Sequence, residues 1–185
     1  DLQNEIATLP DSQSQLGRVN KYAAYALLGK VLLYQDKFAE AASALDNVIG
    51  VYSLVSDYGS QFLRFGENGP ESVFEIQYSN QSNWYDWGCA HCSEGNYAII
   101  MNGPRGWSGP EYAQGWSFNV PTAEFYNSFE EGDTRRDATV LDIEAFAAAT
   151  GANYTEGYDH TGYFNNKYIP RAGESGGQTE LNYLT

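Results

Sequence analysis

Residues 16–50 read LGRVNKYAAYALLGKVLLYQDKFAEAASALDNVIG, and this stretch decides how the N-terminal part of the chain folds. Apolar residues recur there in two runs with the i, i+3, i+4, i+7 spacing of one helix face. The runs are Ala24, Leu27, Leu28, Val31 and Leu32, followed by Phe38, Ala41, Ala42, Leu45, Val48 and Ile49. Because only Gln35, Asp36 and Lys37 separate the runs, the two helices must be antiparallel neighbours in a hairpin. We expect Asp36 to cap the second helix and Gly50 to end it.

This hairpin resembles a tetratricopeptide (TPR) unit, because its small and large residues fall where such repeats place their packing residues. The positions concerned are Ala24, Leu28, Gly29, Tyr34, Phe38, Ala41 and Ala42. One unit cannot bury its own apolar face, so it needs helical neighbours. Residues 1–9 are typical of the end of an earlier helix, which Pro10 stops. An ordinary helical hairpin within a larger bundle is the alternative interpretation.

Beyond residue 50 we predict short elements and loops. Residues 73–78 alternate between apolar and polar side chains, which predicts a half-buried strand with Ile76 facing inward and Glu75 facing outward. Residues 121–150 are predicted to be largely helical again. One helix begins at Pro121 and Thr122, with Phe125, Tyr126 and Phe129 facing inward, and ends at residues 130–133, and a second helix covers residues 141–150. The expected fold class is therefore mainly α, a TPR-like helical hairpin scaffold with a loop-rich insertion and short strands.

The composition restricts the partners of the protein. At 185 residues, the chain (1–185) has the size of a single domain with a core of its own. Lysine and arginine total 10 against 24 aspartate and glutamate residues, which gives a formal net charge of −14. Such a surface repels nucleic acid and anionic membranes, and it suits neutral polar ligands better than ionic ones. No run of about 18 apolar residues is present, so we expect no membrane-spanning helix.

The two cysteines form the motif Cys89-Ala90-His91-Cys92. Zinc would need two further ligands, and the chain has only His91 and His160 to offer. The flanking sequence lacks the βαβ pattern that accompanies a thioredoxin-like redox motif. We expect a local disulfide or two unreactive thiols, with a metal site or redox chemistry as the alternatives, and we predict no cofactor.

The region of residues 80–118 contains all the tryptophans of the chain, Trp84, Trp87, Trp107 and Trp116. Glycine and proline are frequent in the same region and break regular structure. Large flat side chains among such residues indicate an aromatic surface carried on loops, and loops on a rigid scaffold are where binding sites commonly lie. We expect Trp107 to be the most exposed of these rings and Trp116 to serve packing.

In their order and spacing, several segments together resemble the SusD/RagB family, the glycan-binding outer-membrane lipoproteins of gut and oral Bacteroidetes. No single one of these segments is specific, and together they extend over nearly the whole chain. They are residues 1–10, Gly17-Arg18-Val19-Asn20-Lys21, Tyr52-Ser53-Leu54 with Tyr58, Glu71-Ser72-Val73-Phe74-Glu75-Ile76, residues 121–129, Asp133-Thr134-Arg135-Arg136, Gly162-Tyr163-Phe164, and Lys167-Tyr168.

The resemblance implies a function and partners. Family members are longer, so the chain is expected to be a central fragment without the lipidated cysteine and early helices. The implied protein has no catalytic activity and captures oligosaccharide or polysaccharide at the cell surface. Its implied partner is a SusC-like TonB-dependent transporter in the outer membrane, and its only implied membrane attachment is a lipid anchor outside this fragment.

Sugar chemistry narrows the candidate residues. Aromatic rings stack on the C–H faces of a pyranose, while amides, carboxylates and arginine bond to its hydroxyls. The stretch at positions 83–87 offers both kinds of group, as does the neighbourhood of Trp107. The predicted ligand-binding residues are therefore Asn83, Trp84, Tyr85, Asp86, Trp87, Arg105 and Trp107.

Two other functions compete with glycan capture. A TPR-like protein-interaction scaffold would bind a peptide instead of sugar, with the aromatic loop used for packing. A fragment of a glycoside hydrolase would need two carboxylates around the scissile bond, for which Glu130, Glu131 and Asp133 are the obvious cluster. Because Arg135 and Arg136 follow directly at a helix end, this cluster indicates a surface turn with local ion pairs.

Overall fold

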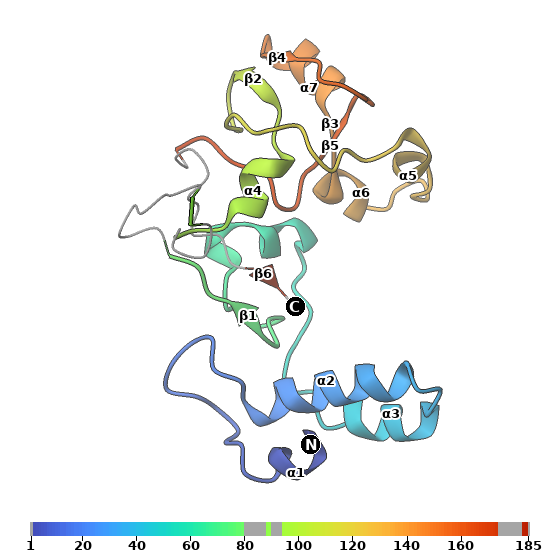
Figure 1. Cartoon of the computed structure of the whole chain (residues 1–185). Helices are drawn as coiled ribbons and strands as arrows, with labels where there is room; N and C mark the ends of the chain where they lie inside the picture. Colours follow the sequence, from blue (N-terminus) through green and yellow to red (C-terminus); the bar gives the residue numbers. More distant parts are fainter. Residues whose placement is uncertain (1, 80–87, 90–93, 174–182, 185) are drawn as a thin grey trace. The chain divides into compact units, whose positions relative to one another are not determined.

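A computed structural model describes residues 2–79, 88–89, 94–173 and 183–184 of the chain. It divides into two compact units, which are considered separately (Figure 1). The helical unit comprises residues 1–56, 66–77 and 183–185, and the loop-rich unit comprises residues 57–65 and 78–182. Of the predicted binding residues, those at positions 83–87 lie outside the described ranges.

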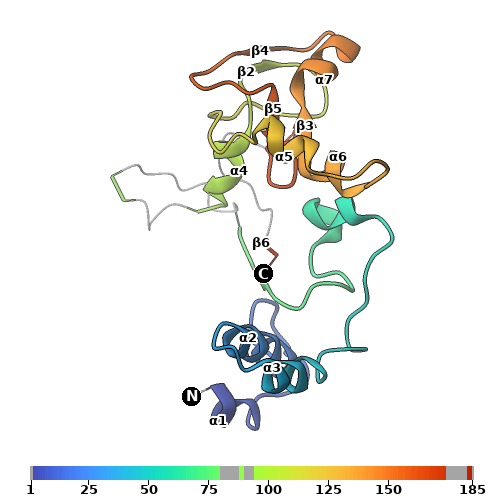
Figure 2. The ribbon, with the colours of Figure 1, turned by 90° about the vertical axis from the view of Figure 1, so that its right-hand side faces the viewer.

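The helical unit contains the predicted hairpin. Its helices are α1 (Leu2–Ile6), α2 (Lys21–Leu33) and α3 (Phe38–Leu45), and α2 and α3 lie side by side in both ribbon views (Figures 1 and 2). The predicted hairpin and the short helix before Pro10 are thus confirmed. The Asn20 side chain accepts a 2.8 Å hydrogen bond from the Ala23 N–H, which fixes the start of α2.

The predicted ends of the second helix are wrong. Lys37, not Asp36, occupies the N-cap of α3, and it makes no side-chain capping bond there. Asp36 has a φ of 59°, because the backbone folds back so that the Lys37 N–H can bond to the Leu32 carbonyl at 3.0 Å. This left-handed residue terminates α2 and therefore cannot also cap α3. The second helix ends at Leu45, before the predicted stop at Gly50.

Small residues bring the two helices of the hairpin together. Ala41 and Ala44 of α3 pack with Leu32 of α2 in one buried cluster. A Cβ at Gly29 would lie 2.6 Å from the Leu45 side chain, so only a glycine permits this approach. The apolar spacing therefore specifies this contact, as the sequence predicts.

The predicted strand is short, and its alternation is inverted. β1 (Glu75–Ile76) pairs antiparallel with β6 (Tyr183–Leu184). Glu75 is only 4% exposed and Ile76 is 46% exposed, so the predicted inward and outward faces are wrong. The Glu75 carboxylate accepts a 2.7 Å hydrogen bond from the Asn68 N–H. Because a buried carboxylate needs such a donor, the loop that supplies it decides which side chain turns inward.

The loop-rich unit is built from short elements joined by long connections. They are η1 (Tyr58–Phe62), η2 (Arg64–Gly66, at the edge of the unit), α4 (Tyr97–Asn102), β2 (Arg105–Ser108), α5 (Ala123–Asn127), α6 (Arg135–Thr139), β3 (Val140–Asp142), α7 (Ile143–Thr150), β4 (Asn153–Thr155) and β5 (Tyr163–Asn165). The β2 strand pairs antiparallel with β4, and β3 pairs antiparallel with β5 (Figure 1).

One apolar core holds this unit together. Its buried side chains come from segments far apart in the sequence, and Trp107, Val120, Phe146 and Tyr154 pack around them. The buried members are Tyr112, Leu141, Ile143, Phe164 and Ile169. Burial raises the pKa of Tyr112, whose hydroxyl donates to the Asn166 side chain at 3.1 Å. Since short strands, helices and connections each supply only one residue to this core, no long periodic pattern in the sequence predicts it.

Within residues 121–150 the helix prediction is partly right. The Thr122 hydroxyl accepts the Phe125 N–H at 3.2 Å, which confirms the predicted start. Phe125 is nevertheless 46% exposed, so its predicted inward position is wrong. Tyr126, which is also predicted to face inward, is partly buried and stacks on Tyr163 with centroids 4.5 Å apart. The predicted second helix is confirmed as α7, which begins at Ile143 because residues 140–142 form the strand β3.

The cysteines and the helix lengths bear on two further predictions from the sequence. Cys89 is disulfide-bonded, and Cys92 lies outside the described residues. Among the helices of the described ranges, none combines the length and the apolar character needed to cross a membrane.

Candidate functional site

Trp107 does not have the exposed position that the sequence predicts. Its ring is half-buried and packs against Tyr112 and Phe146, with centroid distances of 5.9 Å in both cases. A Cβ at Gly109 would lie 2.9 Å from the indole, so the backbone there rests on the ring. The indole Nε1 is buried without a hydrogen-bond partner in the described part of the chain. Trp107 therefore belongs mainly to the core, and a contact with ligand stays a prediction.

Arg105, the other predicted binding residue that the structure describes, lines a surface cavity of about 340 Å³ in the loop-rich unit. Three segments that are distant in the sequence form its walls. They are Arg105 at the start of β2, the run Trp116, Ser117, Phe118, Asn119 and Val120, and the turn Gly157, Tyr158 and Asp159. We treat this aromatic cavity as the candidate functional site.

The end of helix α4 positions the central wall of the aromatic cavity. The N–H groups of Trp116 and Phe118 donate to the carbonyls of Ile100 and Met101 at 2.9 and 2.8 Å. The last carbonyls of a helix have no partner within the helix, so a neighbouring segment of irregular chain can satisfy them. These bonds fix the backbone from which the two aromatic side chains project.

A contact between two glycines makes this arrangement possible. The Gly115 N–H donates to the Pro104 carbonyl at 2.8 Å. A Cβ on Gly115 would lie only 2.3 Å from the Cα of Gly103, which is backbone and cannot rotate away. Only glycine therefore allows the wall of the cavity to approach the end of α4 this closely.

Arg105 is held in place by the same wall. Its Nε donates to the Trp116 carbonyl at 2.6 Å, and its backbone N–H donates to the Ser117 hydroxyl at 3.0 Å. The guanidinium carbon lies 5.6 Å from the centroid of the Phe118 ring. These contacts fix the orientation of the guanidinium, so a ligand that used it would lose less conformational entropy.

The cavity presents aromatic faces beside polar groups. Tyr158 is 95% exposed and Phe118 is 50% exposed, whereas Trp116 is half-buried and packs edge-on against Phe118 at 6.3 Å. The side chains of Asn119 and Asp159 are exposed on the rim. Rings that face solvent next to an arginine, an amide and a carboxylate suit a ligand with apolar faces and polar edges.

Sequence reasoning missed most of this cavity. Phe118, Asn119, Tyr158 and Asp159 were not predicted, and Trp116 was assigned to packing. Asn119 and Asp159 adopt positive φ angles of 54° and 56°, which turn the chain sharply at both walls. Asparagine and aspartate tolerate that conformation better than most residues, but the sequence alone does not reveal which of them adopt it.

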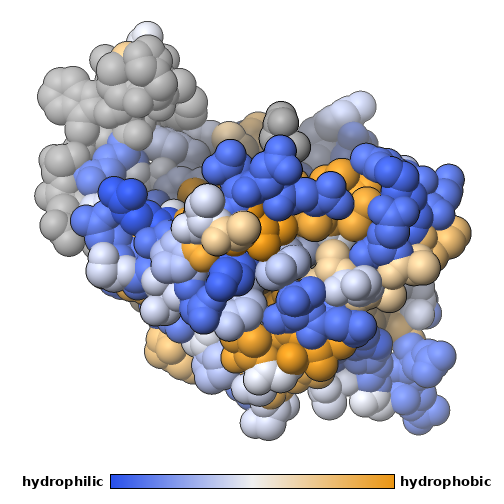
Figure 3. Space-filling model, turned by 90° about the horizontal axis from the view of Figure 1, so that it is seen from below, coloured by the Kyte–Doolittle hydropathy of each residue, from blue (hydrophilic) through white to orange (hydrophobic). Residues whose placement is uncertain are grey.

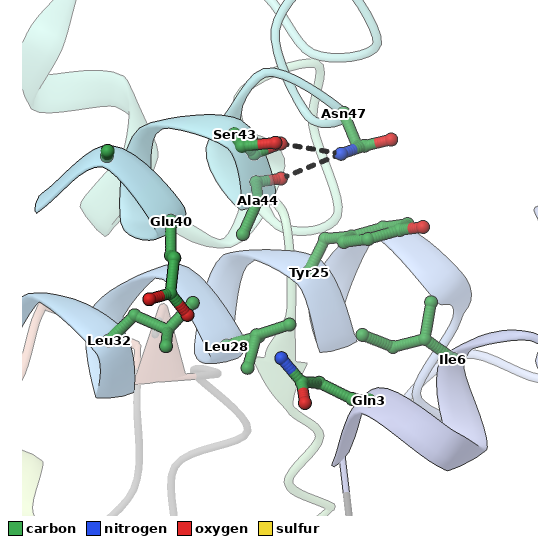
Figure 4. A pocket seen from close by; sticks show the side chains of 10 residues that line it. Gln3, Ile6, Tyr25, Leu28, Leu32, Glu40, Ser43, Ala44 and Asn47 are labelled. Atoms are coloured by element: carbon green, nitrogen blue, oxygen red, sulfur yellow. Dashed lines mark hydrogen bonds between the residues drawn. The ribbon is translucent and has the colours of Figure 1, made fainter. Parts of the chain in front are cut away.

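The helical unit carries a second concave surface of different chemistry. This groove of about 650 Å³ lies between α1, α2 and α3, and Figure 4 shows Tyr25, Leu28 and Leu32 along its floor. Glu40 and Asn47 lie on its rim, and the Asn47 amide is tied to backbone carbonyls of α3. Figure 3 looks onto these helices and shows apolar patches between polar side chains. An apolar groove of this kind suits another helix better than a sugar.

Several known proteins are similar to this chain over its whole length. No family model matches the sequence. SusD-like protein P2 of Formosa agariphila is 28% identical over all of this chain, which covers 38% of that protein. A solved laminarin-binding SusD-like protein superposes with a TM-score of 0.89 at 36% identity, and the match covers 100% of this chain and 45% of that one.

A third relative was solved with its ligand. Surface glycan-binding protein A from Bacteroides thetaiotaomicron in complex with laminarihexaose superposes with a TM-score of 0.87 at 28% identity. The match covers 99% of this chain and 44% of that structure. The chain thus spans less than half the length of the relatives it matches. Both solved structures share the architecture of its helical and loop-rich units, and over its whole length the chain is similar to part of a SusD-like protein.

Proposed function

We propose that the aromatic cavity binds a neutral oligosaccharide and that the protein does so without catalysis. The observation that carries this proposal is the exposed Tyr158 and Phe118 pair beside a fixed Arg105. A pyranose ring could rest on the phenol face while its hydroxyls bond to the guanidinium and to Asp159. Because two of the related proteins carry laminarin or laminarihexaose in their names, a glucan of that kind is the first ligand to test.

The shape of the cavity supports a modest affinity. Its rings Tyr158 and Phe118 are open to solvent, and only these few rings can offset the loss of ligand freedom. We expect dissociation constants in the micromolar to millimolar range, about 4 to 8 kcal/mol of binding free energy. The predicted residues at positions 83–87 and Trp107 remain proposed further contacts of the same ligand.

The family relationship extends the proposal to location and partners. We infer that the protein acts at the outer membrane and passes its glycan to a SusC-like TonB-dependent transporter. The helical unit would serve as a TPR-like scaffold, and its apolar groove favours packing against a further helix. This groove is also the observation that keeps a protein-interaction role as the second candidate function.

Titration of the intact protein with laminarihexaose tests the binding proposal. Tyr158→Ala should weaken binding about 3- to 10-fold, since one aromatic contact is worth about 0.5 to 1.5 kcal/mol. Tyr158 is almost fully exposed, so the variant should unfold at the same temperature as the parent. The matched control is Tyr34→Ala, which removes an 83% exposed tyrosine of the helical unit and should leave affinity unchanged. Equal affinities for the parent and Tyr158→Ala would place the ligand elsewhere.

A further inference from the structure

A second cavity in the loop-rich unit has the same combination of ring and polar groups. It has a volume of about 440 Å³ and shares no residue with the aromatic cavity. Side chains from η1, α5, the following turn, α6 and the segment after β5 surround it. They are Tyr58, Phe125, Ser128, Phe129, Glu130, Asp133, Arg135, Thr139 and Lys167.

Lys167 supplies a hydrogen-bond donor in a fixed position. Its Nζ donates to the Tyr58 hydroxyl at 2.6 Å. The same ammonium lies 5.0 Å from the centroid of the Tyr58 ring and 4.8 Å from that of Phe62. The Tyr58 hydroxyl and the Phe62 ring thus hold the cation, and the ammonium has two further N–H donors for a ligand.

Acidic side chains on the same wall supply acceptors. Asp133 receives three side-chain contacts from Arg135, at 2.6 to 3.1 Å. These bonds, together with one from the Arg135 backbone N–H, lower the pKa of Asp133 to about 2, so it is ionised at neutral pH. Glu130 lines the cavity beside this pair. The positive charges of Lys167 and Arg135 are therefore balanced by the negative charges of two acidic side chains around the cavity.

This balance selects the kind of ligand. A phosphate or sulfate would meet Glu130 and Asp133 as well as Lys167, and the chain carries a net charge of −14. A hydroxyl both donates and accepts, so a polyhydroxylated neutral molecule can use the donors and the acceptors at once. The charges of this cavity thus favour a saccharide over an anion.

Phe125 provides the apolar surface that a saccharide also needs. Its ring is about half exposed and packs edge-on against Phe129, with centroids 5.3 Å apart. The Thr122 cap fixes the backbone of α5 beneath it. An exposed ring that is held by a neighbour and a capped helix can accept a sugar face with little rearrangement.

We propose that this cavity, formed around Phe125 and Lys167, is a second saccharide-binding site of the protein. The ligand class rests on the proposed function, but the site is separate from the aromatic cavity. A polysaccharide long enough to reach both cavities would bind more tightly than an oligosaccharide that fills one, because the second contact becomes intramolecular.

Amide chemical shifts of the ¹⁵N-labelled protein during titration with laminarihexaose test the two sites separately. We expect shifts at Phe125, Phe129 and Lys167 in addition to those at Phe118 and Tyr158. In Phe125→Ala, the first set of shifts should appear only at a laminarihexaose concentration about 3- to 10-fold higher. Tyr158→Ala should raise that concentration for the second set only. Phe65→Ala, which removes a 78% exposed phenylalanine that lines neither cavity, is the matched control.

The outcomes separate this inference from the proposed function. Shifts confined to the aromatic cavity would overturn the second site and leave the proposed function intact. Shifts confined to the neighbourhood of Phe125 would support the second site and overturn binding in the aromatic cavity. A response at Lys167 to glucuronic acid but not to laminarihexaose would overturn the assignment of a neutral ligand. Lys167→Met, with its fold checked by circular dichroism, should weaken the response at Phe125 about as much as the loss of that ring.

Discussion

The helical unit and the loop-rich unit of this protein are stabilised in different ways. In the helical unit, alanines and one leucine on two neighbouring helices form the buried cluster, and residues close in sequence make the contacts. In the loop-rich unit, side chains from β3, α7, β5 and two connections meet in a core of larger residues, including Phe164 and Tyr112.

The difference explains where binding sites arise. A regular hairpin presents repeated faces, and its groove is apolar. The loop-rich unit brings together Arg105, Phe118 and Tyr158 from three segments, so rings and polar groups can be combined freely in one cavity. Irregular connections on a fixed core are thus better suited to a polar ligand than the helices are.

The largest expected effect concerns the core of the loop-rich unit. Phe164 is 1% exposed, and Phe164→Ala should lower the free energy of unfolding by about 3 to 5 kcal/mol because it leaves a cavity. Urea unfolding followed by tryptophan fluorescence reports on this unit, since Trp107 and Trp116 lie in it. A loss below about 1 kcal/mol would mean that the core is less tightly packed than described.

The next effect concerns the glycine contact that supports the aromatic cavity. Gly115→Ala forces the Gly103 backbone to move and should cost about 1 to 3 kcal/mol of stability. It should also weaken laminarihexaose binding, because Trp116 and Phe118 follow directly. Gly59→Ala is the control, since its Cβ would meet Ala138 at an ordinary 3.4 Å. If Gly115→Ala bound laminarihexaose normally, the glycine contact would not be needed for the binding site.

A smaller effect is expected for the cap of the hairpin. Asn20→Ala removes the acceptor of the Ala23 N–H and should destabilise the helical unit by about 1 kcal/mol. Asn20→Asp keeps a capping oxygen and should retain most of that stability. Thermal unfolding followed by circular dichroism at 222 nm, the standard helix signal, measures both. If the alanine and aspartate variants melt together, the cap contributes nothing.

The smallest effect is a pH dependence of the Asp133 and Arg135 pair. Hydrogen bonds from Arg135 lower the pKa of Asp133 from 3.8 to about 2. The stability that this pair provides is therefore complete above about pH 4 and disappears as the pH falls through about 2. Asp133→Asn should melt slightly below the parent at pH 7 and together with it near pH 2. A constant difference between the two proteins down to pH 2 would contradict the shifted pKa.

The candidate sites show how much the sequence could reveal. Arg105 was predicted from its place in an aromatic, glycine-rich region, and it does line the aromatic cavity. Trp107 was predicted from the same composition, yet its ring packs on the core of the loop-rich unit. Composition indicates that aromatic side chains are available, but whether a ring faces solvent depends on which segments pack over it.

The sequence by itself determined the hairpin, the cap at Thr122 and the acidic surface, because each depends on residues close in the chain or on composition alone. Only the tertiary structure decided that Glu75 is buried, that Phe125 is exposed, and that Tyr158 stands beside Arg105. These outcomes depend on donors and packing partners supplied by distant segments. No local pattern encodes such partners, since they exist only once the chain has folded.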